Sequence, residues 1–131
     1  MMDSTDKDTT PSVGRLGRVL FGCGVALQAS EDFREMEDTI EYAESAGVPV
    51  AEVLAPFASG MMLVGGLGTA LWRFPRLATG AVATFLAVVT PTMHDFWNAD
   101  PADRSGERLA FFGNLAMFGA AVAFLRAAYV N

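Results

Sequence analysis

Long apolar segments separated by short polar ones dominate the pattern along this chain. Three of them carry no charged residue: 53–72, 77–93 and 109–125. The hydrocarbon core of a bilayer is about 30 Å thick and an α-helix rises about 1.5 Å per residue, so a spanning helix needs about 20 apolar residues, with about 17 as the lower limit. Each of the three segments is therefore predicted to cross a membrane as a helix.

A fourth apolar segment, near the start of the chain, is shorter. Only twelve uncharged residues separate Arg18 from Glu31. The segment 14–30 reaches spanning length if Arg15 and Arg18 extend their side chains to the headgroups. We therefore predict four spans at about 14–30, 53–72, 77–97 and 109–128, preceded by a polar acidic tail at 1–13.

The first segment has a competing interpretation as a signal peptide. Its basic region would be Arg15 and Arg18, its apolar core 19–26, and its cleavage site would lie near Ala29. The tail upstream contains Asp3 and two further aspartates, which is unusual for the start of a signal peptide. The pattern favours a span, and sequencing the N-terminus of the mature protein would decide.

The segment between the first two predicted spans has a helical pattern of its own. Phe33, Met36, Ile40 and Ala43 recur at three- and four-residue spacing. This spacing predicts a short amphipathic helix on the outer membrane surface, ended by the residues from Gly47 to Pro49. The acidic residues of the segment are interpreted as its solvated face.

The distribution of basic residues predicts the orientation, because Lys and Arg accumulate on the cytoplasmic side of membrane proteins. With four spans, six basic residues fall on the side of the termini: Lys7, Arg15, Arg18, Arg73, Arg76 and Arg126. Three fall on the other side: Arg34, Arg104 and Arg108. Trp72 and Tyr129 stand at inner span ends and Trp97 at an outer one, where aromatic rings prefer to lie. Both termini are therefore predicted to be cytoplasmic.

Small residues inside the predicted spans indicate close helix packing. Nine of the thirteen glycines fall within the uncharged parts of the spans. Three pairs of small residues stand four apart: Gly22 with Ala26, Gly66 with Ala70, and Gly119 with Ala123. Such pairs let helix backbones approach each other in lipid. The predicted fold is all-α, a transmembrane four-helix bundle; a soluble helical bundle is the alternative, but it would need polar faces that these segments lack.

The composition of the chain excludes several classes of protein and of binding site. The chain is acidic, with a formal net charge of −6, 52% hydrophobic residues and 18% charged residues. The apolar content excludes intrinsic disorder, and the absence of a basic cluster in an acidic chain argues against nucleic-acid binding. One Cys, Cys23, excludes an internal disulfide and a thiolate zinc site, and one His excludes a bis-His haem. We expect no metal site and no covalently bound cofactor, and Cys23 is expected to be a buried apolar residue.

Few polar side chains occur inside the spans, and these are candidates for function because burying them in lipid is costly. They are Gln28, Ser59, His94 and Asn114. Counted along the helices, all four fall in the outer half of the membrane. We expect them to form one polar cluster there, since separate burial would leave amides without partners.

The end of the third span concentrates further candidate chemistry. Pro91 cannot donate its backbone hydrogen bond and is expected to kink the helix near Ala87. On a continuing helix, His94 shares a face with Trp97 and Asn98. Three roles stay open for His94: a proton relay, a hydrogen bond to a quinone carbonyl, or an anchor that joins the helix end to Asn114.

The candidate site residues follow from these considerations. The catalytic candidates are His94, Asp95 and Asn114. The cofactor-binding candidates are Gln28, His94 and Trp97.

Several short stretches resemble the DoxX family of small membrane proteins. An arginine-rich start leads into Leu20-Phe21-Gly22, and Ala46-Gly47-Val48-Pro49 precedes the second span. The glycine-rich stretch 63–68, Asn114-Leu115-Ala116 and, most specifically, His94-Asp95-Phe96-Trp97 continue the resemblance. It covers nearly the whole chain after the acidic tail.

The resemblance implies a four-span bundle, and it implies relatives among subunits of membrane thiosulfate:quinone oxidoreductases and of membrane-associated oxidative-stress complexes. Uncharged residues stand where relatives often carry charged side chains or histidine: Gln28, Met62, Ala110 and Gly113. This difference favours an accessory subunit over an enzyme that acts by itself.

The resulting expectation is an accessory or membrane-anchor subunit of a quinone-linked redox complex, for sulfur oxidation or oxidative stress. Its expected partners are the lipid bilayer, a redox partner subunit and further copies of the chain, and its expected cofactor is a quinone held without a covalent bond. The alternatives are a membrane scaffold without a redox role, and a transporter of small solutes or lipids.

Overall fold

The structure is a computed structural model that describes residues 14–130, and all regular elements within this range are helical. They are α1 (Arg15–Arg34), α2 (Met36–Ser45), α3 (Ala51–Leu71), α4 (Pro75–Met93), the 3-10 turn η1 (Phe96–Asn98) and α5 (Pro101–Val130). The predicted all-α class is confirmed. The acidic tail predicted at 1–13 lies outside the described residues.

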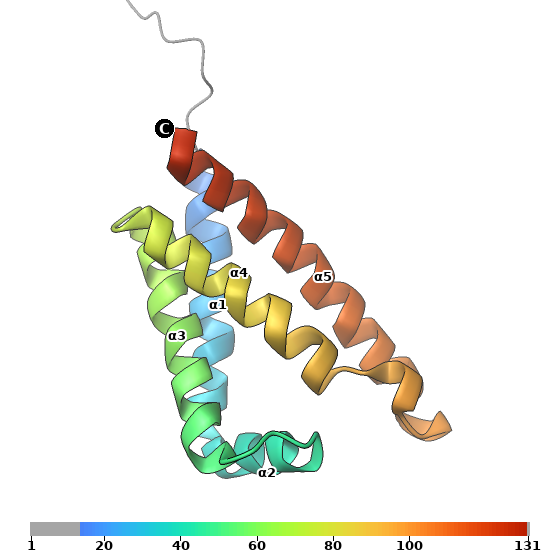
Figure 1. Cartoon of the computed structure of the whole chain (residues 1–131). Coiled ribbons are helices and arrows are strands. Elements are labelled where there is room, and N and C mark those ends of the chain that lie inside the picture. The colour runs from blue at the N-terminus through green and yellow to red at the C-terminus, as the bar shows by residue number, and fades with distance from the viewer. Residues whose placement is uncertain (1–13, 131) are drawn as a thin grey trace, which may run out of the picture.

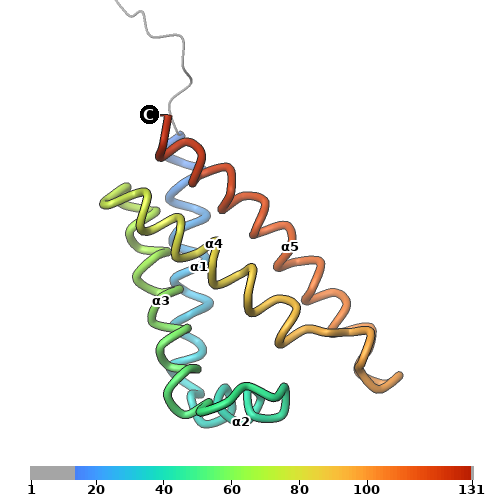
Figure 2. Tube along the Cα trace, in the orientation of Figure 1, coloured from blue at the N-terminus to red at the C-terminus, as the bar shows by residue number. Residues whose placement is uncertain are grey.

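The four long helices form two antiparallel pairs, α1 with α3 and α4 with α5 (Figure 1). The pairs lie close together at the end that holds the α3–α4 turn, and they diverge toward the opposite end (Figure 2). There α2 lies across the ends of α1 and α3, and it packs mainly on α3. The candidate functional site lies between the two pairs, where they diverge.

Three helical segments are long and apolar enough to cross a membrane: Ala51–Leu71, Pro75–Asn98 and Pro101–Val130. The fourth predicted span, now α1, does not meet the same criterion of length and hydropathy. The physical reason is the charge at both of its ends, since the uncharged part between Arg18 and Glu31 is too short. The four-span count is therefore not confirmed by length and composition.

Helix α4 ends earlier than the sequence pattern predicts. It passes through Pro91 and stops at Met93, after which the backbone of His94 leaves the helical region with φ −127°. Pro91 has no N–H for the carbonyl one turn earlier, which weakens the last turn. The prediction that His94, Trp97 and Asn98 share one helical face is thus wrong, because a loop separates His94 from η1.

Helices α1 and α3 touch through their backbones at two predicted pairs of small residues. A Cβ atom added to Gly66 would lie 2.7 Å from the carbonyl oxygen of Gly22 and 2.9 Å from the nitrogen of Ala26. One added to Gly22 would lie 2.5 Å from the nitrogen of Ala70. Only glycine fits at a distance this short, so these two positions fix how α1 lies on α3.

The main core joins all four long helices with small and medium side chains. Its buried members are Val25, Ala29, Met62, Val82, Ala83, Leu86 and Ala121. A second cluster of Ala43, Ala51 and Ala55 holds α2 against α3, with Met36 and Ile40 packed on it. The predicted helix between the first two spans is therefore present with its apolar face covered, although Phe33 belongs to α1.

Helices α5 and α1 expose more apolar surface than is usual in a soluble protein. Helix α5 has only two buried residues, Ala121 and Ala128. Cys23 is exposed on α1, so the expectation that it would be buried within the chain is wrong. Such apolar exposure is ordinary for helices that face lipid.

A cavity between the helix pairs as the candidate functional site

A cavity of about 920 Å³ occupies the space where the two helix pairs diverge. All five α-helices contribute to its wall. Where α2 meets the end of α4 the lining includes the polar side chains of Thr39, Tyr42 and His94, and we call this part the polar end. The rest of the wall is largely apolar, with Phe57, Met61, Phe85 and Met117, but it also includes Gln28, Ser59 and Asn114. A largely apolar wall with a few polar groups is typical of a ligand site.

The cavity reaches deep along the helices. Its lining on α3 runs from Leu54 to Met62, and on α4 from His94 back to Thr84. At 1.5 Å per residue these stretches correspond to about 12 Å and about 15 Å. This depth is about half of the hydrocarbon core of a bilayer.

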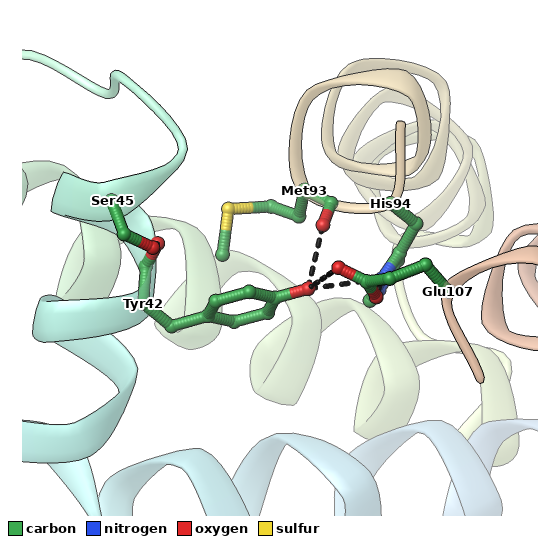
Figure 3. Close-up of polar contacts among 5 residues, drawn as sticks. All are labelled: Tyr42, Ser45, Met93, His94 and Glu107. Carbon is green, nitrogen blue, oxygen red and sulfur yellow. Dashed lines mark hydrogen bonds and ion pairs between the residues drawn. The ribbon is translucent and has the colours of Figure 1, made fainter. Parts of the chain in front are cut away.

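A hydrogen-bonded group of three side chains stands at the polar end of the cavity (Figure 3). Nδ1 of His94 lies 3.0 Å from Oε1 of Glu107, and the Tyr42 hydroxyl lies 2.6 Å from Oε2 of the same carboxylate. The hydroxyl also lies 2.7 Å from the Met93 carbonyl oxygen. A phenol has one proton, so Tyr42 donates to Glu107 or to Met93 at any moment. The group links α2, the end of α4 and the start of α5.

The surroundings of Tyr42 keep its hydroxyl protonated. Burial raises the pKa of the Tyr42 phenol far above its usual value, and the nearby carboxylates of Glu107 and Asp95 raise the pKa further. Since the phenolate would lie beside Glu107, Tyr42 serves as a hydrogen-bond donor at physiological pH.

A second polar contact joins the two helices of the first pair. Oγ of Ser59, which is buried, donates to Oδ2 of Asp32 at 2.9 Å. Burial raises the pKa of the Asp32 carboxyl above its ordinary value, and the hydrogen bond from Ser59 opposes this rise in part. The surroundings of Asp32 in the cavity wall therefore favour the neutral carboxyl over the charged carboxylate.

The structure brings together the four polar residues that the sequence analysis placed in the outer half. Gln28, Ser59, His94 and Asn114 all line the cavity. No hydrogen bond joins any two of them within residues 14–130. Ser59 instead bonds to Asp32, and His94 bonds to Glu107 rather than to Asn114.

The two remaining candidates lie away from the cavity wall. Asp95 accepts a hydrogen bond from Asn98 at 3.2 Å. Trp97 is 53% exposed and packs edge-on against Phe96 and Phe111. Neither lines the cavity, so within the described residues they are parts of the α4–α5 connection.

Sequence reasoning missed three residues of the site: Asp32, Tyr42 and Glu107. Asp32 and Tyr42 lie in the segment whose acidic residues are interpreted as a solvated face, and Glu107 lies in the polar connection before the fourth predicted span. Tyr42 gave one usable signal, because it is the one aromatic side chain in the acidic segment of α2. Glu107 gave none, since nothing in the pattern relates it to His94 across the loop.

The described residues contain no group of three or more His, Cys, Asp or Glu side chains placed to hold a metal ion. The chemistry that the cavity offers is hydrogen bonding and proton exchange through Asp32, Tyr42 and His94, with Glu107 bonded to the last two from outside the lining. Its apolar part offers a binding surface for hydrocarbon.

Three apolar helical segments of spanning length, with an open cavity between the helix pairs, define a small α-helical membrane protein. The family model for DoxX matches residues 15–95, and the chain belongs to this family. The match runs from the start of α1 to Asp95 and includes His94 but not Glu107 or Asn114. Neither the comparison with curated proteins nor that with solved structures found a match.

Proposed function

We propose that this DoxX-family membrane protein is an accessory subunit of a quinone-linked redox complex, and that its own part is to hold the quinone in the cavity between the helix pairs. The observation that carries the proposal is one cavity whose largely apolar wall includes a few polar side chains that can donate hydrogen bonds. The cavity volume of about 920 Å³ lies in the range of ligand sites, about 300–1,000 Å³.

The residues present fit a quinone. Its carbonyl oxygens accept hydrogen bonds, and the cavity lining offers donors in Gln28, His94 and Asn114. Its apolar tail would contact Phe57, Phe85 and their neighbours. When bound, a quinone supplies the capacity to take up two electrons, which a partner subunit delivers, together with two protons.

Glu107 determines which nitrogen of His94 is left for a ligand. Nδ1 lies 3.0 Å from the Glu107 carboxylate, so Nε2 is the ring nitrogen left to face a ligand. A doubly protonated ring donates from Nε2 to a carbonyl, whereas a neutral ring with its proton on Nδ1 accepts there from a hydroxyl. His94 can therefore hold both the oxidised and the reduced form of such a ligand and exchange a proton with it.

The proposal includes four spans, with α1 crossing the membrane beside α3. The Arg18 guanidinium lies 5.8 Å from the Trp72 ring at one end of α3, and Asp32 bonds to Ser59 near the middle of α3. Helix α1 thus accompanies α3 over fourteen residues, or about 21 Å. A helix packed this closely along a spanning helix lies in the same membrane. The basic residues then favour cytoplasmic termini.

Binding of decylubiquinone to the full-length protein in detergent, measured by isothermal titration calorimetry, tests the cavity assignment. We expect His94→Gln to weaken binding about tenfold, because one hydrogen bond to a ligand contributes about 1 kcal/mol or somewhat more. Ala58→Phe places a ring in the cavity and should abolish binding. Ala87→Phe is the matched control, since Ala87 is exposed on α4 and does not line the cavity.

Absence of binding by the wild-type chain, or equal effects of Ala58→Phe and Ala87→Phe, would contradict the cavity assignment. A redox partner that co-purifies and is lost on deletion of this chain would support the complex.

The second candidate function is a membrane scaffold without a redox role. It is favoured by the exposed apolar surface of α5, which includes Leu109, Phe112 and Leu115. Recovery of a stable partner complex that contains no quinone would favour the scaffold. Solute flux in liposomes that contain only this chain would instead indicate a transporter.

A further inference from the structure

One end of the molecule carries arginines without acidic residues, whereas the opposite end carries both signs of charge with an excess of acids. Five arginines stand at the end where the helix pairs meet: Arg15, Arg18, Arg73, Arg76 and Arg126. The helical segments that reach this end, within 14–30, 53–94 and 108–130, contain no acidic residue. Neither of the two ion pairs found among residues 14–130 involves these arginines. This arginine end has a positive charge that the described helices do not neutralise.

Two of the guanidinium groups are held in place by aromatic rings. Arg76 lies 4.5 Å from the centroid of the Tyr129 ring, and its Nε donates to the Ala128 carbonyl oxygen at 3.3 Å. Arg18 lies 5.8 Å from the Trp72 ring. Only Nε of Arg76 is used in the bond to Ala128, so the two terminal nitrogens stay available for an anion. The stacked Tyr129 ring lowers the entropy cost of holding the guanidinium in this place.

The α3–α4 turn beside Arg76 has the properties of a binding surface. Trp72 and Phe74 both have a left-handed backbone, with φ of 55° and 49°, which costs about 1–3 kcal/mol per residue. This conformation leaves Phe74 with 74% of its surface exposed, next to Leu77. A groove of about 280 Å³ is lined by Phe74, Pro75, Arg76 and Leu77. An apolar groove thus adjoins a fixed guanidinium.

The start of α4 adds hydrogen-bond donors at the same place. Pro75 is the first residue of the helix, and the first intrahelical bond runs from the Ala78 N–H to the Phe74 carbonyl. The N–H groups of Arg76 and Leu77 precede that bond, so they have no partner within the helix. Free N–H groups and the positive end of the helix dipole favour a phosphate.

From these observations we infer that the arginine end binds an anionic phospholipid of the membrane leaflet on that side. Arg73, Arg76 and the start of α4 hold the phosphate of the headgroup. The exposed Phe74 and Leu77 contact the upper part of an acyl chain. The ligand is a membrane lipid rather than a free anion, because the groove next to the guanidinium is apolar and open.

Native mass spectrometry of the full-length protein in detergent, with added phosphatidylglycerol or phosphatidylcholine, tests this inference. We expect phosphatidylglycerol to be retained in preference to phosphatidylcholine, and this preference to decline as salt rises. Arg76→Gln should lower the phosphatidylglycerol affinity about fivefold, because one basic residue near an anionic headgroup contributes about that much. Arg76→Lys keeps the charge and should retain most of the affinity even though it loses the stacking.

Arg104→Gln is the matched control. Arg104 is an exposed arginine at the opposite end that also donates to a backbone carbonyl, that of Ala99 at 3.1 Å. The control should leave lipid retention unchanged. Equal retention of the two lipids by the wild-type chain, or equal losses from Arg76→Gln and Arg104→Gln, would overturn the inference.

Discussion

At the scale of single residues, Asp32 shows how the fold changes the chemistry of a side chain that looks ordinary in the sequence. It stands among acidic neighbours at the end of α1, yet the fold turns it toward Ser59 and half-buries it. Burial raises the pKa of its carboxyl. A group with a raised pKa in the folded state favours folding while it is protonated, and this contribution is lost as the pH rises through that pKa.

Asp32→Asn is therefore expected to raise the melting temperature at pH 7, where the buried charge opposes folding in the wild type. The amide oxygen still accepts the hydrogen bond from Ser59. At pH 3, below the ordinary pKa of an aspartate, both side chains are neutral and the difference should vanish. Thermal unfolding in detergent, followed by circular dichroism at the two pH values, measures the effect.

Glu41→Gln provides the control for Asp32→Asn, because Glu41 is exposed on α2. It should change the melting temperature little at either pH. A stabilisation by Asp32→Asn that is equal at pH 3 and pH 7 would contradict the role of burial.

The candidate residues illustrate what side-chain type and depth can predict. Gln28, Ser59, His94 and Asn114 were grouped by their depth in the membrane, and the structure places all four on one cavity. Their hydrogen-bond partners could not be predicted, because those partners come from segments outside the spans. The position of Glu107 opposite His94 depends on the end of α4 and on the length of the α4–α5 connection, neither of which the sequence pattern fixed.

At the scale of elements, glycine pairs decide which helices touch. The pairs at Gly22 and Gly66 meet across α1 and α3, whereas Gly119 on α5 has nothing within 4 Å of the place where a Cβ would stand. The same spacing thus forms a contact in two cases and not in the third. Sequence spacing identifies helix faces that allow close approach, but it does not say which faces meet.

Gly66→Ala is expected to destabilise the protein by about 1–3 kcal/mol, because the added methyl group would force α1 away from α3. Gly119→Ala adds the same methyl group in open space and should be neutral, or stabilising by up to about 1 kcal/mol through the higher helix propensity of alanine. Reversible unfolding in mixed detergent and denaturant measures both variants. Equal stability of the two variants would show that α1 and α3 do not approach as closely as the structure has them.

Element boundaries were harder to predict than the elements themselves. The apolar segments located α3, α4 and α5, and the spacing from Met36 to Ala43 located α2. The end of α4 at Met93 was missed because the predicted span continues past His94 and Asp95 to take in the aromatic Phe96 and Trp97. The uncharged segment 77–93 ends where the helix does, so the charge pattern was the better guide to this boundary.

At the scale of the whole molecule, the proposed topology puts both termini on one side of the membrane. Fusing alkaline phosphatase or green fluorescent protein to either terminus tests this arrangement in cells. We expect fluorescence and no phosphatase activity from both fusions, since the phosphatase folds only outside the cytoplasm. A phosphatase fused after Ser45, at the end of α2, should be active and serves as the positive control.

Opposite results at the two termini would mean an odd number of spans, and α1 would then not cross. Such a result would also remove the lining that α1 contributes to the cavity, including Gln28 and Asp32. The fusions therefore bear on the ligand site as well as on the topology.

The separation of charge between the two ends also makes the molecule an electric dipole. In the proposed orientation, the dipole lies along the membrane normal with its positive end inside the cell. A resting potential that is negative inside favours this direction by about 2.3 kcal/mol per 100 mV for each elementary charge that inversion would carry across. Once inserted, the chain is thus kept from turning over by the voltage of the membrane as well as by the hydration of its charged ends.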